Sequence, residues 1–212
     1  MTKPRVLLAD DHRIVAEGLK SLLTEAFELA GIVEDGRALV NAARELNPDV
    51  IVADISMPLL NGIDALVQLR QHDPRTRVVF LTMHRDAAYA RRALEAGASG
   101  FVLKHSATVE LVLAIRAALQ GRTYVSPDLA AELLLASKQD AHRQADPVDA
   151  LTPRQREILQ LIVAGKSAKE IAAMLSLSAR TVEDHKYRLM ESLGIDNSAE
   201  LIHFAIKHGL VP

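Results

Sequence analysis

Cysteine and tryptophan are both absent from the 212-residue sequence, and aromatic residues of all kinds make up only 3% of it. The lack of cysteine excludes disulfide scaffolds, cysteine nucleophiles and thiolate metal sites. The scarcity of aromatic residues argues against nucleic-acid platforms on which bases stack. The sequence has no apolar run of about 18 residues and no signal-peptide core. We therefore expect a soluble, cytoplasmic protein with no membrane partner.

Charge is balanced over the whole chain, and its distribution indicates two domains. The formal net charge is −2, so the overall charge does not indicate a nucleic-acid partner. Hydrophobic residues amount to 49%, enough to bury a core. Residues 137–150 contain a single aliphatic side chain larger than alanine, Val148, and are typical of a polar linker. We predict a first domain, a helix and linker, and a second domain at residues 1–122, 123–150 and 151–212.

Short apolar runs alternate with helical patterns in the first domain. The predicted strands are residues 6–9, 29–33, 50–53, 78–82 and 101–103. Each run is almost continuously apolar, as expected for strands whose two faces are both covered. Five strand–helix units predict an α/β fold, a doubly wound five-stranded parallel sheet with right-handed crossovers. The last of these helices, residues 109–119, is closed by Gly121.

The second domain is predicted to be a small all-α domain of four helices. Thr152 with Gln155 and Ser167 with Glu170 have the spacing of capping boxes, which mark the first two helix starts. Ser178 is positioned to cap the third helix and Ser198 the fourth. Only residues 176–178 separate the second helix from the third, which is a helix-turn-helix spacing.

Polar side chains follow four of the predicted strands. Asp10 and Asp11 follow the first, Asp54 the third and Lys104 the fifth, while Thr82 ends the fourth. Ligands of parallel sheets bind at the carboxyl ends of the strands, so these five residues are expected to share one crevice. Three carboxylates repel one another there, and a divalent cation with oxygen ligands, such as Mg²⁺, relieves that repulsion.

A carboxylate in such a crevice can act as a nucleophile toward a phosphoryl group. That transfer needs positioning and charge neutralisation, which Lys104, the Thr82 hydroxyl and Mg²⁺ would supply. The alternative is that the acids only cap the helices that follow them. The joint occurrence of all five residues at matching strand ends speaks against this alternative.

Four segments of the first domain resemble the receiver domain of two-component response regulators, which has a flavodoxin-like fold. They are residues 7–12, 53–62, 81–82 and 100–104. The resemblance implies that Asp54 is the phosphoacceptor, and that Asp10, Asp11, Asp54 and the backbone carbonyl of Ser56 bind Mg²⁺. It also implies that Thr82 and Lys104 contact the phosphoryl group, and that Pro58 and Gly62 shape the turn after the nucleophile.

Phe101 matches the aromatic residue whose rotamer, together with Thr82, reports the active state of the family. The family often has tyrosine there, and phenylalanine cannot make its hydroxyl hydrogen bond, so only ring packing can switch. The alternative is plain core packing. His12 and His84 flank the predicted pocket, but an ionised carboxylate nucleophile needs no general base. The resemblance suggests only that His84 modulates hydrolysis of the phosphoaspartate.

The second domain is similar to the LuxR-type helix-turn-helix domain, and the two resemblances together indicate the NarL/FixJ family of response regulators. They imply that residues 179–193 form a helix that lies in the major groove. The groove-facing residues would be Thr181, Glu183, Asp184, Tyr187 and Arg188, and those near phosphates Lys166, Lys169, Arg180 and Lys186. Carboxylates at Glu183 and Asp184 repel phosphate but can accept from a cytosine amino group. Alternatively, both acids face solvent.

The last predicted helix has an apolar arc of roughly 200°, wider than one small core requires. We place Leu201 and Ala205 toward the domain core, and Ile202 and Ile206 at a two-fold dimer contact. Alternatively, the linker or the first domain covers the excess face.

The sequence predicts a transcription regulator rather than an enzyme. A sensor histidine kinase would phosphorylate Asp54 with Mg²⁺, which would control sequence-specific binding of a homodimer to double-stranded promoter DNA. The alternatives are an orphan regulator that works without phosphorylation, a phosphotransfer or phosphatase enzyme, and a helical module that binds protein or RNA.

Overall fold

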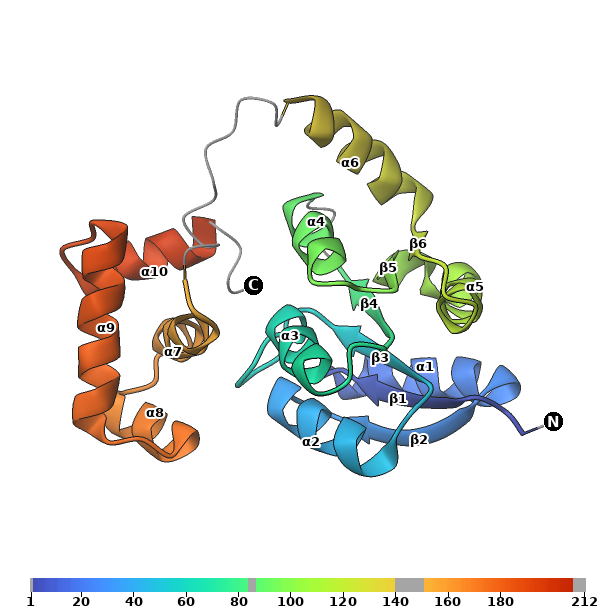
Figure 1. Ribbon diagram of the computed structural model, residues 1–212, viewed down its shortest axis with the longest axis horizontal. Helices are drawn as coiled ribbons and strands as arrows, with labels where there is room; N and C mark the ends of the chain where they lie inside the picture. Colours follow the sequence, from blue (N-terminus) through green and yellow to red (C-terminus); the bar gives the residue numbers. More distant parts are fainter. Residues whose placement is uncertain (1, 84–86, 140–150, 208–212) are drawn as a thin grey trace. The chain divides into compact units, whose positions relative to one another are not determined.

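The computed structural model in Figure 1 describes residues 2–83, 87–139 and 151–207. The chain divides into two compact units, residues 1–142 and 143–212. The first unit is built around a sheet, and the described part of the second unit contains helices alone. Each unit has its own hydrophobic core.

The first unit contains a parallel sheet of six strands in the order β2-β1-β3-β4-β5-β6. The strands are β1 (Arg5–Ala9), β2 (Glu28–Val33), β3 (Val50–Asp54), β4 (Val78–Thr82), β5 (Gly100–Leu103) and β6 (Tyr124–Val125). The predicted doubly wound parallel sheet is confirmed, but the prediction of five strands was wrong. The sixth strand has only two residues, too few to produce an apolar run that stands out from its surroundings.

Helices cover both faces of this sheet. They are α1 (Arg13–Ala26), α2 (Gly36–Leu46), α3 (Gly62–His72), α4 (Ala87–Glu95) and α5 (Ala107–Leu119), while α6 (Pro127–Gln139) packs against α4. Successive side chains of β1 alternate between two cores: Val6 and Leu8 pack with α1 and α5, and Leu7 and Ala9 with α2 and α3. This explains why the strands are continuously apolar, since neither of their faces meets water.

The ends of these helices follow the local sequence. The Asp35 side chain caps α2 by accepting hydrogen bonds from the backbone N–H groups of Arg37 and Ala38. Asn47 ends α2 in the left-handed conformation (φ 46°), directly before a proline. Gly121 follows α5 with φ 72°, as its predicted closing role requires.

The segment after α5 belongs to the first unit. The backbone N–H of Ser126 donates to the Phe101 carbonyl (2.9 Å), and the Leu103 N–H donates to the Ser126 hydroxyl (3.2 Å). That hydroxyl in turn donates to Glu110 on α5. Leu129 of α6 is fully buried in the core that α4 also enters. The helix that begins the predicted linker is thereby fixed to β5 and α5.

The second unit contains α7 (Pro153–Val163), α8 (Ala168–Leu175), α9 (Ala179–Leu193) and α10 (Ser198–Lys207). Both predicted capping boxes are confirmed, at Thr152 and at Ser167. Ser178 caps α9, as predicted. The predicted cap of α10 was wrong by one residue. Asn197 is the cap, because its side-chain oxygen accepts from the Glu200 N–H (2.9 Å) and its backbone carbonyl accepts from Leu201.

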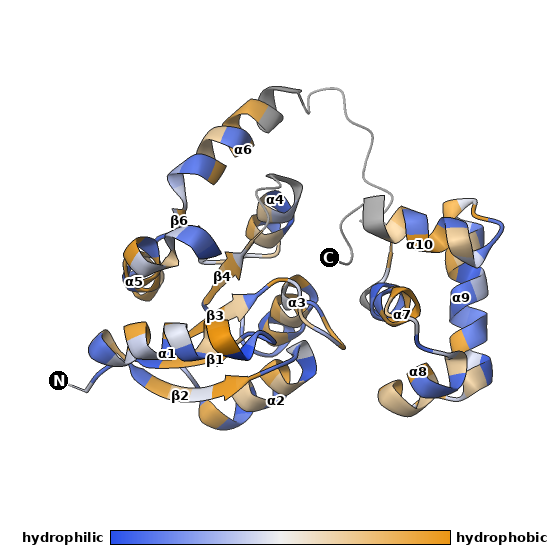
Figure 2. Cartoon of the chain, turned by 180° about the vertical axis from the view of Figure 1, so that it is seen from behind, coloured by the Kyte–Doolittle hydropathy of each residue, from blue (hydrophilic) through white to orange (hydrophobic). Residues whose placement is uncertain are grey.

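Hydropathy along the ribbon agrees with these cores. Figure 2 shows the strands of the first unit coloured largely as hydrophobic, whereas the helices of both units alternate between hydrophilic and hydrophobic residues. Within the described part of the chain, no helix is both long enough and apolar enough to cross a membrane.

Candidate functional site

The carboxyl ends of β1, β3 and β5 bring three charged side chains into contact. The Lys104 ammonium Nζ lies 2.7 Å from Asp10 Oδ2 and 2.6 Å from Asp54 Oδ2. Asp10 is only 1% exposed and Asp54 5%. Thr82, at the end of β4, is buried as well. Because one lysine faces two buried carboxylates, the site has a net negative charge when both carboxylates are ionised.

Burial and pairing shift the protonation of this group in defined directions. Desolvation raises the pKa of Asp54 above its ordinary value, and it outweighs the opposing hydrogen bond and charge of Lys104. Burial by itself would lower the pKa of Lys104, but its hydrogen bonds to Asp10 and Asp54 outweigh that effect and raise it. Lys104 therefore stays protonated at neutral pH.

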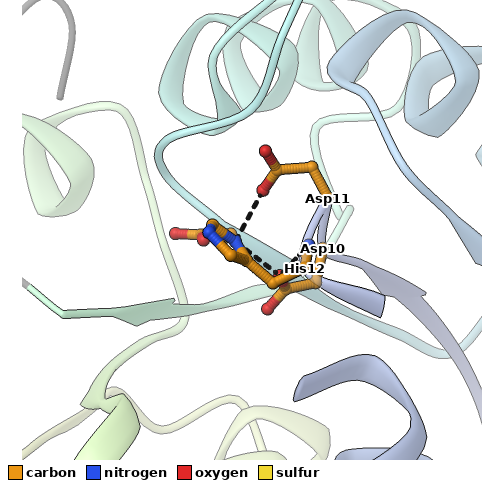
Figure 3. A group of neighbouring side chains, drawn as sticks. Asp10, Asp11 and His12 are labelled. Carbon is orange, nitrogen blue, oxygen red and sulfur yellow. Dashed lines mark hydrogen bonds and ion pairs between the residues drawn. The ribbon is translucent and has the colours of Figure 1, made fainter. Parts of the chain in front are cut away.

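Asp11 and His12 lie beside Asp10, as Figure 3 shows, and both are exposed to solvent. His12 Nδ1 lies 2.9 Å from Asp11 Oδ1 and 3.4 Å from Asp10 Oδ1. One ligand atom from each of Asp10, Asp11, His12 and Asp54 lies within 4.8 Å of the others. Three carboxylates, one of them partly exposed, fit a hard divalent cation that keeps some of its water. Asp10, Asp11 and Asp54 could therefore hold Mg²⁺.

The loop after β3 is held in a fixed shape behind Asp54. The Ser56 N–H donates to Asp54 Oδ1 (3.2 Å), and the Gly62 N–H donates to the Ile55 carbonyl (2.9 Å). A Cβ atom on Gly62 would lie 2.3 Å from the Asp54 carbonyl oxygen, so only glycine fits there. Leu59 adopts a left-handed conformation (φ 67°), which costs a leucine free energy.

Two parts of this loop were missed by sequence reasoning. One is the left-handed conformation of Leu59: the turn itself was predicted from Pro58 and Gly62, but leucine does not indicate a positive φ. The other is Gly36, whose Cβ position lies 1.9 Å from the Leu60 carbonyl oxygen, so the α2 N-terminus touches the loop. The sequence Asp35-Gly36 marks a turn and a helix start, but it does not indicate this contact with a distant segment.

Phe101 of β5 points into the core beside Phe80. Its ring is fully buried, and the two ring centroids are 6.4 Å apart with their planes inclined at 57°. The arrangement is that of an ordinary tilted aromatic pair. The core-packing alternative therefore describes the ring as it lies in this structure, and a role in switching stays a prediction.

The predicted DNA-contacting side chains lie mostly on the outer surface of the second unit. The exposed ones are Lys166, Lys169, Arg180, Glu183, Asp184, Tyr187 and Arg188. Val182 and Leu189, on the opposite side of α9, are buried. Thr181 is half-buried, and its N–H donates to the Ser178 hydroxyl (3.0 Å).

Lys186 differs from the other predicted cations of this surface. It is half-buried, and at 100° per residue it projects only about 40° away from Val182, on the core side of α9.

Sequence reasoning also missed Arg154, which pairs with Glu157 (2.5 Å) and donates to the Leu175 carbonyl (2.9 Å). Arg154 thereby joins α7 to the end of α8 and holds the turn before α9.

On α10, Leu201 and Ala205 are fully buried in the core of the second unit, which confirms their predicted orientation. Ile202 is half-buried. The side chain of Ile206 and the whole of His84 lie outside the described residues.

Comparisons with known proteins agree with both halves of this description. Residues 6–116 match the response regulator receiver domain family, and residues 149–205 match the bacterial regulatory proteins of the luxR family. The transcriptional regulatory protein MctR of Rhizobium johnstonii is 40% identical over 211 residues, 99% of this chain and 96% of that protein. The oxygen regulatory protein NreC of Staphylococcus aureus is 36% identical, with 98% and 99% covered.

A solved structure is similar over almost the whole chain. It is RcsB of Salmonella enterica serovar Typhimurium, bound to promoter P1flhDC in the presence of phosphomimetic BeF3⁻. The identity is 29%, the TM-score is 0.61, and the match covers 96% of this chain and 98% of RcsB.

The doubly wound sheet with acids and a lysine at its carboxyl edge, followed by a helix-turn-helix unit, defines a two-component response regulator. The chain belongs to the NarL/FixJ family of these regulators, which combine a receiver domain with a LuxR-type DNA-binding domain.

Proposed function

We propose that Asp54 accepts a phosphoryl group from a sensor histidine kinase, and that this modification controls binding of the second unit to promoter DNA. The contact of Lys104 Nζ with both Asp54 and Asp10 carries the proposal. Two buried carboxylates around one lysine cost free energy that a purely structural site would avoid. A site that exchanges this arrangement for a phosphoryl group has a reason to retain it.

In the transfer, an Asp54 carboxylate oxygen attacks phosphorus. A P–O bond forms while the P–N bond of the phosphohistidine breaks, and the bonding electrons pass to the imidazole. Asp54 needs no general base because its carboxylate is already the nucleophile. Lys104 is close enough to follow the charge from the carboxylate to the phosphoryl oxygens, and the Thr82 hydroxyl can donate to one of them.

We propose that Asp10, Asp11, Asp54 and the Ser56 carbonyl hold Mg²⁺ in this crevice. When bound, the ion supplies positive charge that neutralises the phosphoryl oxygens. Asp10, directly after β1, would bind the ion from the buried side, and the exposed Asp11 would bind it from the solvent side.

The test of the phosphoacceptor is labelling by a small-molecule phosphodonor such as acetyl phosphate, with Mg²⁺ present. Asp54→Asn should abolish labelling, because the amide is not a nucleophile, while circular dichroism shows an intact fold. Asp73→Asn, at an exposed carboxylate outside the crevice, is the matched control and should be labelled like the wild type. Full labelling of Asp54→Asn would refute the assignment.

For output, we propose that the outer face of α9 enters the major groove and that Lys166, Lys169 and Arg180 approach phosphates. The measurement is fluorescence anisotropy with duplex DNA selected by genomic footprinting, with and without beryllofluoride. Beryllofluoride should tighten binding by the wild type and leave Asp54→Asn unchanged. Equal binding in all four conditions would instead support an orphan regulator that works without phosphorylation.

We also propose that Ile202 and Ile206 form a two-fold contact on DNA. Ile202→Glu should leave binding to a single half-site unchanged and weaken binding to a full inverted repeat. Ala199→Glu, at an exposed position of the same helix, is the matched control. Unchanged binding of Ile202→Glu to the full repeat would move the dimer contact elsewhere.

A further inference from the structure

His12 is the one member of the crevice that the proposed function leaves without a role. The backbone N–H of His12 donates to Asp10 Oδ1 (2.9 Å), and this hydrogen bond holds the His12 backbone beside Asp10. Its imidazole Nδ1 then turns toward the same two carboxylates, at 2.9 Å from Asp11 Oδ1 and 3.4 Å from Asp10 Oδ1 (Figure 3). The ring is 64% exposed, so packing does not force it into this position.

The two distances from His12 Nδ1 are compatible with binding of the imidazole and both carboxylates to one metal ion. Two atoms bound at about 2.1 Å and at right angles are about 3.0 Å apart, and at a tetrahedral angle about 3.4 Å apart. The two distances from His12 Nδ1 equal these values within 0.1 Å. A hydrogen bond between imidazole and carboxylate would produce the shorter distance as well, so the experiment must separate the two roles.

We infer that His12 is a metal ligand, and that this receiver site accepts a borderline first-row ion such as Co²⁺, Ni²⁺ or Zn²⁺ with an imidazole nitrogen added to the carboxylates. The inference rests on the proposed metal site of Asp10 and Asp11. Imidazole suits these ions, whereas Mg²⁺ takes oxygen ligands and gains little from nitrogen. His12 therefore widens the range of cations that can occupy the crevice.

The two classes of cation should respond to His12 in opposite ways. A borderline ion replaces the contact between His12 and Asp11 with two bonds to itself. Mg²⁺ takes only the carboxylate, so it must break that contact without compensation. Removing the imidazole should weaken Co²⁺ binding and leave Mg²⁺ binding unchanged or slightly tighter.

The experiment is titration of the full-length protein with Co²⁺ and, separately, with Mg²⁺, followed by calorimetry and by the visible absorption of bound Co²⁺. His12→Ala should weaken Co²⁺ affinity at least about tenfold at the site from which Mg²⁺ displaces Co²⁺. Removing an outer-shell partner already lowers metal affinity by about that factor, and removing a ligand should lower it more. His12→Asn keeps an N–H donor near the position of Nδ1 and should lose Co²⁺ affinity too. His105→Ala, at an exposed histidine outside the crevice, should change neither ion.

The outcomes separate this inference from the proposed site. If Asp11→Asn weakens both ions while His12→Ala changes both by the same factor, the metal site stands and His12 is not a ligand. Retention of Co²⁺ affinity by His12→Asn would also overturn the inference, because it would show that the hydrogen bond suffices. If Asp11→Asn affects neither ion, the proposed metal site itself is wrong.

Discussion

The two candidate surfaces of this protein place their charges in opposite environments. At the edge of the sheet, Asp10 and Asp54 are buried and share Lys104. On α9, Glu183 and Arg188 are exposed to solvent. Burying a charge costs free energy that ion pairing must offset, and such a charge is retained where function requires it. An exposed charge costs almost no free energy. The receiver crevice can therefore be interpreted from its geometry, while the DNA face is interpreted mainly from its family.

The largest effect should come from a charge placed in the small core of the second unit. Val182→Asp places a carboxylate at a position that is only 1% exposed, and we expect a loss of about 4 kcal/mol or more, enough to unfold that unit. Calorimetry should show the second unit's transition disappear while the first unit's remains. Glu183→Ala, one residue away and exposed, is the control and should change the free energy of unfolding by less than about 0.5 kcal/mol.

The same experiment tests whether the two units unfold independently. Each unit has a core of its own, so the first should not depend on the second. Loss of both transitions in Val182→Asp would show that the two units fold as one.

A smaller effect is expected at Gly36, which links α2 to the loop behind Asp54. Gly36→Ala would push a methyl group into the Leu60 carbonyl, and we expect a loss of about 1–3 kcal/mol from overpacking. Gly18→Ala is the matched control: its Cβ position in α1 has no atom within 4 Å, so alanine should stabilise the helix by about 1 kcal/mol. Chemical denaturation measures both, and equal effects would show that the loop gives way freely.

The sequence predicts the crevice well because strand ends are local signals. Asp10, Asp54 and Lys104 each follow an apolar run, and parallel strands of one sheet must bring them together. The position of His12 over Asp11 could not be predicted, since it depends on a side-chain rotamer. The left-handed Leu59 could not be predicted either, because leucine is not a residue that signals such a turn.

In the second unit, the helix N-caps were predicted more accurately than the orientation of side chains around the helices. Ser167 and Ser178 mark the starts of α8 and α9 because each side chain accepts a hydrogen bond from the backbone N–H three residues later. The half-buried position of Lys186 follows only once α9 is packed on its neighbours. The contact from Arg154 to Leu175 joins residues 21 apart, beyond the reach of any local pattern.

The raised pKa of Asp54 gives a pH-dependent difference that has a definite sign. A folded pKa above the unfolded value of 3.8 means that protonation favours the folded state. The contribution of Asp54 is fully present below pH 3.8 and is lost as the pH rises through its folded pKa. The melting temperature of Asp54→Asn, measured from low to neutral pH, should therefore gain on that of the wild type above pH 3.8 and then level off. A melting temperature of Asp54→Asn that falls relative to that of the wild type as the pH rises would contradict the direction of the shift.

The smallest effect concerns which face of α9 meets DNA. Loss of a phosphate contact should lower the slope of log affinity against log salt by about one unit. Arg180 is exposed and is proposed to approach a phosphate, whereas Lys186 is half-buried on the core side, so Arg180→Ala should change the slope by about one and Lys186→Ala by less. Circular dichroism of both variants controls for the fold of the helix. The reverse order, with Lys186→Ala causing the larger change, would show that α9 presents a face rotated toward Lys186. The exposed carboxylates Glu183 and Asp184 would then lie at the rim of the interface, where they would repel the DNA backbone instead of accepting from bases.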